Sequence, residues 1–217
     1  PEFVDKAGSK YGSTIYAIEF ESGATGCHNV EITDNEIDIN GSCRYLYGID
    51  VFQTWGAESK NTNFTVANNT LALNGGSRMA EAIYASAVED IVIADNTISS
   101  TSQGSAYGIA TDSLTNGVIS GNTIVDNATV NNMAYAIANT HSNNVSIENN
   151  NIIAEGQGAI GVGVMDGTEI SIDGNTINIT GRDFTVANTS DSIGKANAAI
   201  LNSDDSDVTV GENTIIE

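Results

Sequence analysis

One eight-residue pattern, apolar-x-apolar-x-x-Asn-x-apolar, recurs seven times along this chain of 217 residues. Examples are IVIADNTI, GVISGNTI, ISIDGNTI and VTVGENTI. Successive copies are separated by 25 to 38 residues, and a repeat of this length is typical of a solenoid. The asparagines of the pattern are Asn35, Asn69, Asn96, Asn122, Asn150, Asn175 and Asn213.

Each repeat contains the pattern of three short strands. Apolar and polar residues alternate before the asparagine, which is the two-residue period of a strand. The residue before the asparagine is mostly Asp, Asn or Gly, and these tolerate the left-handed backbone of a tight bend. Upstream of this pattern, the repeat has another apolar residue that directly follows a small one, as in Gly108-Ile109. In the fourth repeat, the sequence predicts strands at 107–111, 117–120 and 123–126.

Three short strands per repeat, each with one apolar side, predict an all-β fold, a parallel β-helix of about seven coils. Coils stack about 4.8 Å apart, like neighbouring strands of a sheet. The repeated asparagines would then form a column, in which each side-chain amide bonds to the next coil. Such a ladder satisfies polar groups buried at the bends, so we interpret the asparagine column as structural.

The NNTI-like and YGI-like repeats resemble the right-handed parallel β-helix repeats of pectate-lyase-like proteins. They are most similar to the adhesin-like surface proteins of methanogenic archaea, and the resemblance covers roughly residues 13 to 217. It implies a right-handed helix, an extracellular location on the cell surface, and adhesion to a glycan or protein of a partner cell. The same scaffold also carries lyases and hydrolases, so fold alone does not select a function.

The repeat is continuous, which favours one domain over residues 4–217. Residues 1–3 (Pro-Glu-Phe) are interpreted as a vector-derived scar, and the rest as a segment of a longer surface protein. Such a segment is expected to be a monomeric rod with a narrow core along its axis.

Acidic residues dominate the charge of the chain. Asp and Glu number 28 against 7 Lys and Arg, which gives a formal net charge of −21. Because this field repels phosphate backbones, nucleic acid is excluded as an expected partner. No hydrophobic run is long enough to cross a bilayer, so direct membrane insertion of this segment is not expected.

Irregular segments concentrate in the first two coils, where insertions occupy residues 21–28 and 52–60. Trp55, the only tryptophan, lies in the second insertion. Its side chain suits a sugar-stacking platform or an interface anchor, although it could equally cover the apolar base of its own loop. Tyr16, Tyr47, Tyr107 and Tyr135 share one position of the repeat and are expected to stack along the rod.

Two arginines occupy equivalent loop positions. The segments NGSCR, ending at Arg44, and NGGSR, ending at Arg78, align residue for residue and place the arginines on adjacent coils. Two neighbouring guanidinium groups could clamp a carboxylate of a ligand, or they could neutralise nearby Asp and Glu of the chain itself. Tyr45 adds aromatic surface beside them.

Glu19 and Asp50 are the only candidates for catalysis, and the enzyme signal is weak. They occupy the same outward position in the first two coils, about one strand spacing apart, near the separation of retaining glycosidase carboxylates. No motif of polygalacturonases or pectate lyases is present. His28 and His141 are isolated in the sequence, without a Ser-His-Asp or Cys-His spacing.

Cysteine and metal patterns leave their alternatives open. Cys27 and Cys43 could form a disulfide or remain buried thiols. The acidic turn at 202–207 could bind calcium, but it lacks the spacing of an EF-hand, so no metal site and no cofactor is predicted.

These observations predict a non-catalytic adhesion or ligand-binding module on the cell surface. We expect its contact on coils one to three, formed by Trp55, Tyr45, Arg44, Arg78, Glu19 and Asp50. The competing hypotheses are a polysaccharide lyase or glycoside hydrolase using the same side, and a structural spacer without a ligand.

Overall fold

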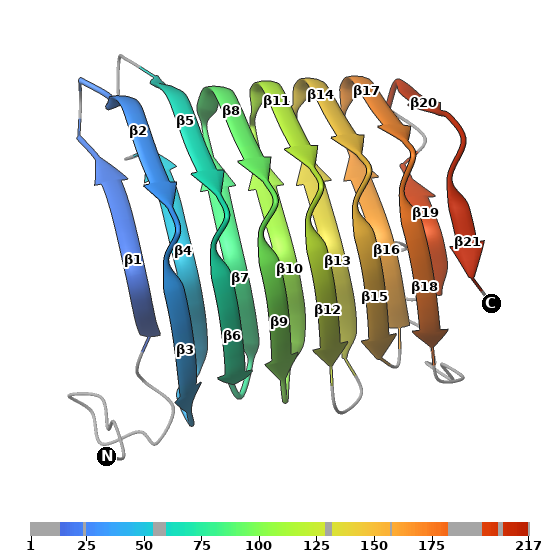
Figure 1. Cartoon of the computed structure of the whole chain (residues 1–217), viewed down its shortest axis with the longest axis horizontal. Helices are drawn as coiled ribbons and strands as arrows, with labels where there is room; N and C mark the ends of the chain where they lie inside the picture. Colours follow the sequence, from blue (N-terminus) through green and yellow to red (C-terminus); the bar gives the residue numbers. More distant parts are fainter. Residues whose placement is uncertain are drawn as a thin grey trace.

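The computed structural model describes residues 14–23, 25–53, 60–128, 132–156, 158–181, 197–203 and 206–216. Within these ranges the chain is a parallel β-helix, as predicted, with three sheets of seven strands each. Successive coils lie side by side along one axis, with β1 (Thr14–Ser22) at one end of the rod and β21 (Thr214–Ile216) at the other (Figure 1). The described part contains no helix long and apolar enough to cross a membrane.

Every coil contributes one strand to each sheet, and all the pairings are parallel. Sheet A consists of β1 (Thr14–Ser22), β4 (Tyr45–Gln53), β7 (Met79–Ser86), β10 (Ser105–Asp112), β13 (Met133–Thr140), β16 (Gly158–Met165) and β19 (Ala198–Asn202). Sheet B consists of β2 (His28–Thr33), β5 (Asn61–Ala67), β8 (Val88–Ala94), β11 (Thr115–Ser120), β14 (Asn143–Glu148), β17 (Thr168–Asp173) and β20 (Val208–Val210). Sheet C consists of β3 (Glu36–Gly41), β6 (Thr70–Gly75), β9 (Thr97–Ser102), β12 (Thr123–Ala128), β15 (Asn151–Gly156), β18 (Thr176–Gly181) and β21 (Thr214–Ile216).

In the fourth coil, β10, β11 and β12 lie where strands are predicted and extend the predicted ranges by a few residues. The bend between β11 and β12 is at Gly121, whose φ is +65°. The residues before the other ladder asparagines, from Asp34 to Gly174, have φ between 55° and 67°. Left-handed backbone at these six positions turns the chain from sheet B into sheet C.

The core is a stack of apolar columns, because equivalent residues of successive coils are in register. Ile93, Ile119 and Ile147 follow one another on β8, β11 and β14, and none of them is exposed. At the C-terminal end the same column reaches Val210, which is 52% exposed because no described strand covers it. Burial of the core therefore depends on neighbouring coils.

The asparagine column forms a continuous ladder inside the bends. In each step, the backbone N–H and the side-chain Nδ2 of one asparagine donate to Oδ1 of the next. For Asn96 and Asn122 these distances are 3.0 and 2.9 Å. The Nδ2 of Asn122 also donates to the carbonyl of Ile93, at 2.9 Å. The steps join Asn35, Asn69, Asn96, Asn122, Asn150, Asn175 and Asn213.

A second row of polar side chains lies on the surface, six residues before the ladder asparagines. Asn144 donates to Asn116 at 2.8 Å, and Asn116 donates to Asp90 at 3.1 Å. All three have left-handed backbone, with φ from 55° to 58°. Sequence analysis missed this row, although Asn or Asp recurs there in most repeats.

Candidate functional site

The outward side of sheet A carries Glu19 and Asp50, together with the four tyrosines that share one position of the repeat. Its first column runs through Tyr16, Tyr47, Glu81, Tyr107 and Tyr135, which are paired in register from β1 to β13. Its second column begins with Glu19, Asp50 and Tyr84. We refer to these eight residues as the tyrosine–acid surface.

The tyrosines stack in two pairs, as expected from their shared position. The rings of Tyr16 and Tyr47 are 4.8 Å apart between centroids, with an angle of 12° between their planes. Those of Tyr107 and Tyr135 are 5.2 Å apart, with an angle of 4°. Because these separations are close to one strand spacing, the ring faces look along the axis of the rod.

Glu19 and Asp50 are neighbours on β1 and β4, as the repeat predicts. Their environments differ, since Glu19 is exposed while Asp50 is only 4% exposed. The Oδ1 atom of Asp50 is buried without a hydrogen-bond partner in the described structure. Burial first, and then the charge of Glu19, raises the pKa of Asp50 to about 6.

Glu81 on β7 is a third acid of this surface, and sequence analysis missed it. It is 7% exposed, and burial, followed by the charge of Asp50, raises its pKa to about 8. Glu81 interrupts the tyrosine column in the third coil, between Tyr47 and Tyr107. A gap in the column was visible in the sequence, but the burial of the acid that fills it was not.

Arg44 and Arg78 lie on adjacent coils, where sheet C turns into sheet A. The backbone N–H of Arg78 donates to the carbonyl of Arg44 at 3.1 Å, and the Arg44 guanidinium lies 5.3 Å from the centre of the Tyr45 ring. Within the described part of the chain, neither guanidinium has a carboxylate within 4 Å. The alternative to a ligand clamp was that the two arginines neutralise acids of the chain itself. No such ion pair is observed among the described residues.

A polar cleft of about 250 Å³ lies at the same corner of the coils. Amide and hydroxyl side chains dominate its wall, and these groups can both donate and accept hydrogen bonds. The corner thus combines two arginines, one aromatic ring and a polar recess. The lining residues are Asn40, Gly41, Ser42, Asn74, Gly75, Gly76, Ser77 and Gln103.

Other sequence-predicted residues lie apart from this surface or outside the description. Trp55 lies outside the described residues, as does part of the acidic turn at 202–207. Cys27 precedes β2 and Cys43 precedes β4, and both are free thiols. Among the described residues, no group of three or more His, Cys, Asp or Glu is placed to hold a metal ion.

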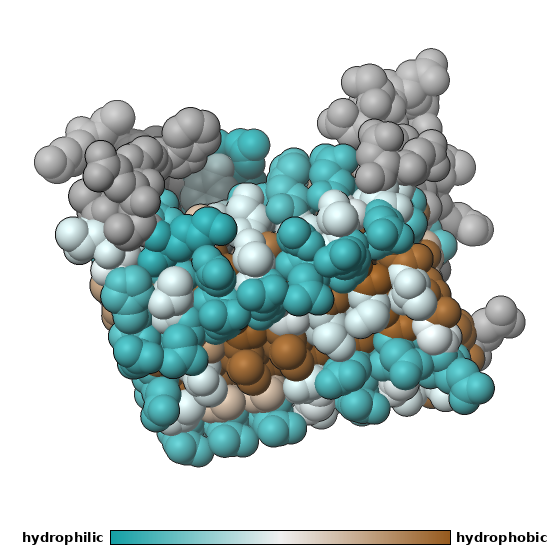
Figure 2. All heavy atoms as spheres, turned by 90° about the horizontal axis from the view of Figure 1, so that it is seen from above, coloured by the Kyte–Doolittle hydropathy of each residue, from teal (hydrophilic) through white to brown (hydrophobic). Residues whose placement is uncertain are grey.

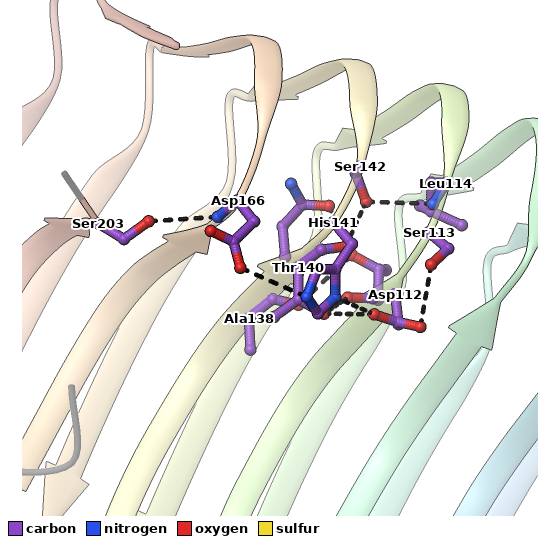
Figure 3. Close-up of polar contacts among 11 residues, drawn as sticks. Asp112, Ser113, Leu114, Ala138, Thr140, His141, Ser142, Asp166 and Ser203 are labelled. Atoms are coloured by element: carbon purple, nitrogen blue, oxygen red, sulfur yellow. Dashed lines mark hydrogen bonds and ion pairs between the residues drawn. The ribbon is translucent and has the colours of Figure 1, made fainter. Parts of the chain in front are cut away.

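His141 is isolated in the sequence but not in the structure, because turns of adjacent coils bring two acids to it (Figure 3). Its Nδ1 lies 2.7 Å from Oδ1 of Asp112, and its Nε2 lies 3.4 Å from Oδ2 of Asp166. The hydrogen bond to Asp112 is the main cause that raises the pKa of His141. Ser113 donates to Asp112 rather than to the histidine, so the arrangement does not activate a serine nucleophile.

Comparison with known proteins gives no relative from which a function could be transferred. No protein-family model, curated protein or solved structure matches the chain. The tyrosine–acid surface and the Arg44–Arg78 corner are therefore interpreted from their own chemistry. The chain is a parallel β-helix with two polar sites near the beginning of its described coils.

Proposed function

We propose that this protein is a ligand-binding module of a cell surface that binds acidic glycans of a partner cell without catalysis. The observation that carries the proposal is the pair Arg44 and Arg78, which lie on adjacent coils beside a polar cleft and have no described carboxylate partner. Two guanidinium groups without a described counter-charge suit a carboxylate or sulfate group, because each guanidinium can bind two oxygens of the anion.

The overall charge makes this pair unusual. In a chain with a net charge of −21, acids nearby would ordinarily attract every arginine. The other described cation, Lys60, lies 3.9 Å from a carboxylate oxygen of Glu89. An anionic ligand would explain why the two arginines at this corner have no carboxylate partner among the described residues. The resemblance to adhesin-like proteins supports display on the surface as a monomeric rod.

A binding screen on immobilised acidic and neutral glycans tests the proposal. We expect saturable binding of acidic glycans, and a loss of at least about tenfold in affinity in an Arg44→Gln/Arg78→Gln variant. Lys60→Gln removes one positive charge outside the corner and should change the affinity by no more than about twofold. Equal losses in the two variants, or a preference for neutral glycans, would refute the role of the arginine pair.

A Trp55→Ala variant belongs in the same screen, because the second inserted loop follows β4 of the same sheet. Weaker binding in this variant would extend the contact to that loop. Unchanged binding would restrict it to the corner and its cleft.

Glycoside hydrolysis is a second candidate function, favoured by the neighbouring carboxyl groups of Glu19 and Asp50. The raised pKa of Asp50, about 6, suits a general acid, while the exposed Glu19 could act as its partner. Release of reducing ends from a bound glycan, abolished by Glu19→Gln or Asp50→Asn, would establish this function. Binding without release supports the non-catalytic module.

A further inference from the structure

Positive charge at the corner between sheets C and A is confined to two coils. Arg44 and Arg78 occupy equivalent positions there, directly before β4 and β7. In the next two coils, Gly104 and Asn132 stand at the same position, directly before β10 and β13. Lys60, the only other Lys or Arg in the described part of the chain, lies before β5 of sheet B and pairs with an acid. The described cations at the corner therefore form a patch two coils wide.

Acidic side chains border this patch on both sheets. On sheet C, the exposed Glu36 and Asp38 lie on the same outward side of β3 as Asn40, which lines the cleft. On sheet A, Glu19 and Asp50 are neighbours on the outward side of β1 and β4. No described cation lies within 4 Å of any of these four carboxylates. A ligand that extends from the corner around either sheet therefore meets negative charge.

Along the rod, the coils offer uncharged polar groups and then another acid. Asn40 and Asn74 line the cleft, and their column continues through Thr101 and Asn127 to Glu155. Three strand spacings, about 14 Å, separate the strand of Asn74 from that of Glu155. The amide and hydroxyl groups between them can bind the hydroxyl groups of a sugar. None of these five residues carries a positive charge for a second acidic group.

We propose that the corner of Arg44 and Arg78 recognises a single acidic sugar on an otherwise neutral glycan, and that it discriminates against glycans with an acidic group on every sugar. This inference rests on the proposed function and narrows its ligand class. Two guanidinium groups can bind the oxygens of one carboxylate or sulfate. Each further anionic group would approach acidic positions of a chain whose net charge is −21, so added charge weakens binding.

Three galacturonate tetrasaccharides with one backbone test this ligand class by calorimetry on the full chain. The first is fully methyl-esterified, the second has a single free carboxyl group, and the third has every carboxyl group free. We expect the mono-acid to bind at least about tenfold more tightly than the neutral compound, an advantage that should disappear in Arg44→Gln/Arg78→Gln. The fully acidic compound should bind at least about fivefold more weakly than the mono-acid.

The outcomes of this comparison separate the two proposals. Equal or tighter binding of the fully acidic compound would overturn the single-acid inference and leave the proposed glycan binding intact. If neither acidic compound binds more tightly than the neutral one, both the single-acid inference and the binding of acidic glycans fail.

Salt dependence provides a second measurement with a defined sign. Raising the salt concentration from about 0.01 to about 0.1 M shortens the Debye length from about 30 to about 10 Å and screens the charges outside the corner. The disadvantage of the fully acidic compound should therefore shrink at least about twofold, because its additional groups are repelled. A polyanion held by further cations would instead lose affinity relative to the mono-acid as salt rises, and that result would contradict the inference.

A pair of double variants locates the repulsion. Glu36→Gln/Asp38→Asn, on the exposed side of β3, should improve binding of the fully acidic compound at least about threefold and leave the mono-acid within about twofold. Glu148→Gln/Glu169→Gln removes the same charge from β14 and β17 of sheet B and should change both affinities by no more than about twofold. Equal gains in the two variants would show an effect of net charge alone and overturn the role of the acids beside the corner.

Discussion

At the scale of single residues, Asn122 shows why the ladder position accepts only asparagine. Its Oδ1 accepts hydrogen bonds from the backbone N–H and the Nδ2 of Asn96, while its own Nδ2 donates to the Ile93 carbonyl and to Asn150. The side chain is fully buried, so water cannot replace the hydrogen bonds that these partners would lose. An amide is the one small side chain that donates and accepts in this geometry.

Asn122→Leu is therefore expected to destabilise the protein by about 3 kcal/mol or more, because it leaves several buried polar groups unpaired. Urea unfolding followed by circular dichroism measures this change. Asn151→Leu is the matched control, since Asn151 lies on the exposed side of β15 and should change stability by less than about 1 kcal/mol. Similar effects of the two substitutions would contradict a structural role of the ladder.

At the scale of strands and turns, the corner between sheets C and A depends on close contact between coils. The backbone N–H of Ser105 donates to the carbonyl of Arg78 at 2.9 Å. Gly104 precedes it, and a Cβ atom at Gly104 would lie only 1.9 Å from the same carbonyl oxygen. A glycine is required here because the backbones approach too closely for any side chain. The same contact holds the loop that carries Arg78.

Gly104→Ala should accordingly lower the free energy of unfolding by about 2 kcal/mol or more, since the backbone must shift to relieve the clash. Gly41→Ala, at the equivalent corner of the first coil, has no atom within 4 Å of the added Cβ and should change stability by no more than about 0.5 kcal/mol. Thermal and urea unfolding of the pair distinguish the two cases. An unaffected Gly104→Ala protein would mean that the corner is more adaptable than its contacts indicate.

At the scale of the whole molecule, acidic groups in buried positions link folding to pH. Burial raises the pKa of Asp50 to about 6 and that of Glu81 to about 8, and it raises the pKa of the fully buried Asp126 as well. A carboxyl group with a raised pKa in the folded state stabilises that state most below its unfolded pKa, near 4. This stabilisation is lost as the pH rises through the pKa values that these groups have in the folded state. On the face shown in Figure 2, a band of hydrophobic side chains lies between rows of hydrophilic ones.

The free energy of unfolding should thus be at least about 2 kcal/mol larger at pH 5 than at pH 8.5, since one pKa unit corresponds to about 1.4 kcal/mol. Loss of the charge on His141 acts in the same direction, whereas Asp112, with a lowered pKa, acts oppositely at acidic pH. Urea titrations across this range provide the measurement. An Asp50→Asn/Glu81→Gln variant should show a flatter profile.

The control for general charge repulsion is a Glu36→Gln/Asp38→Asn variant, which removes two negative charges from exposed positions of β3. It should retain the pH dependence of the natural chain. If both double variants flatten the profile equally, net charge rather than burial causes the effect.

The sequence by itself determined the parallel β-helix, its bends and its ladder, because these arise within each repeat. Alternating apolar residues, a left-handed residue and Asn122 or its equivalents are enough to predict them. Tertiary structure decided what depends on register between coils. It placed Glu81 between the strands of Tyr47 and Tyr107, and Asp166 beside His141. It also left Arg44 and Arg78, whose adjacency the sequence predicts, without a described carboxylate within 4 Å. The burial of a side chain depends on its neighbours in the adjacent coils. Equivalent residues of adjacent coils are 25 to 38 residues apart in the sequence, so a single repeat does not reveal how buried a side chain is.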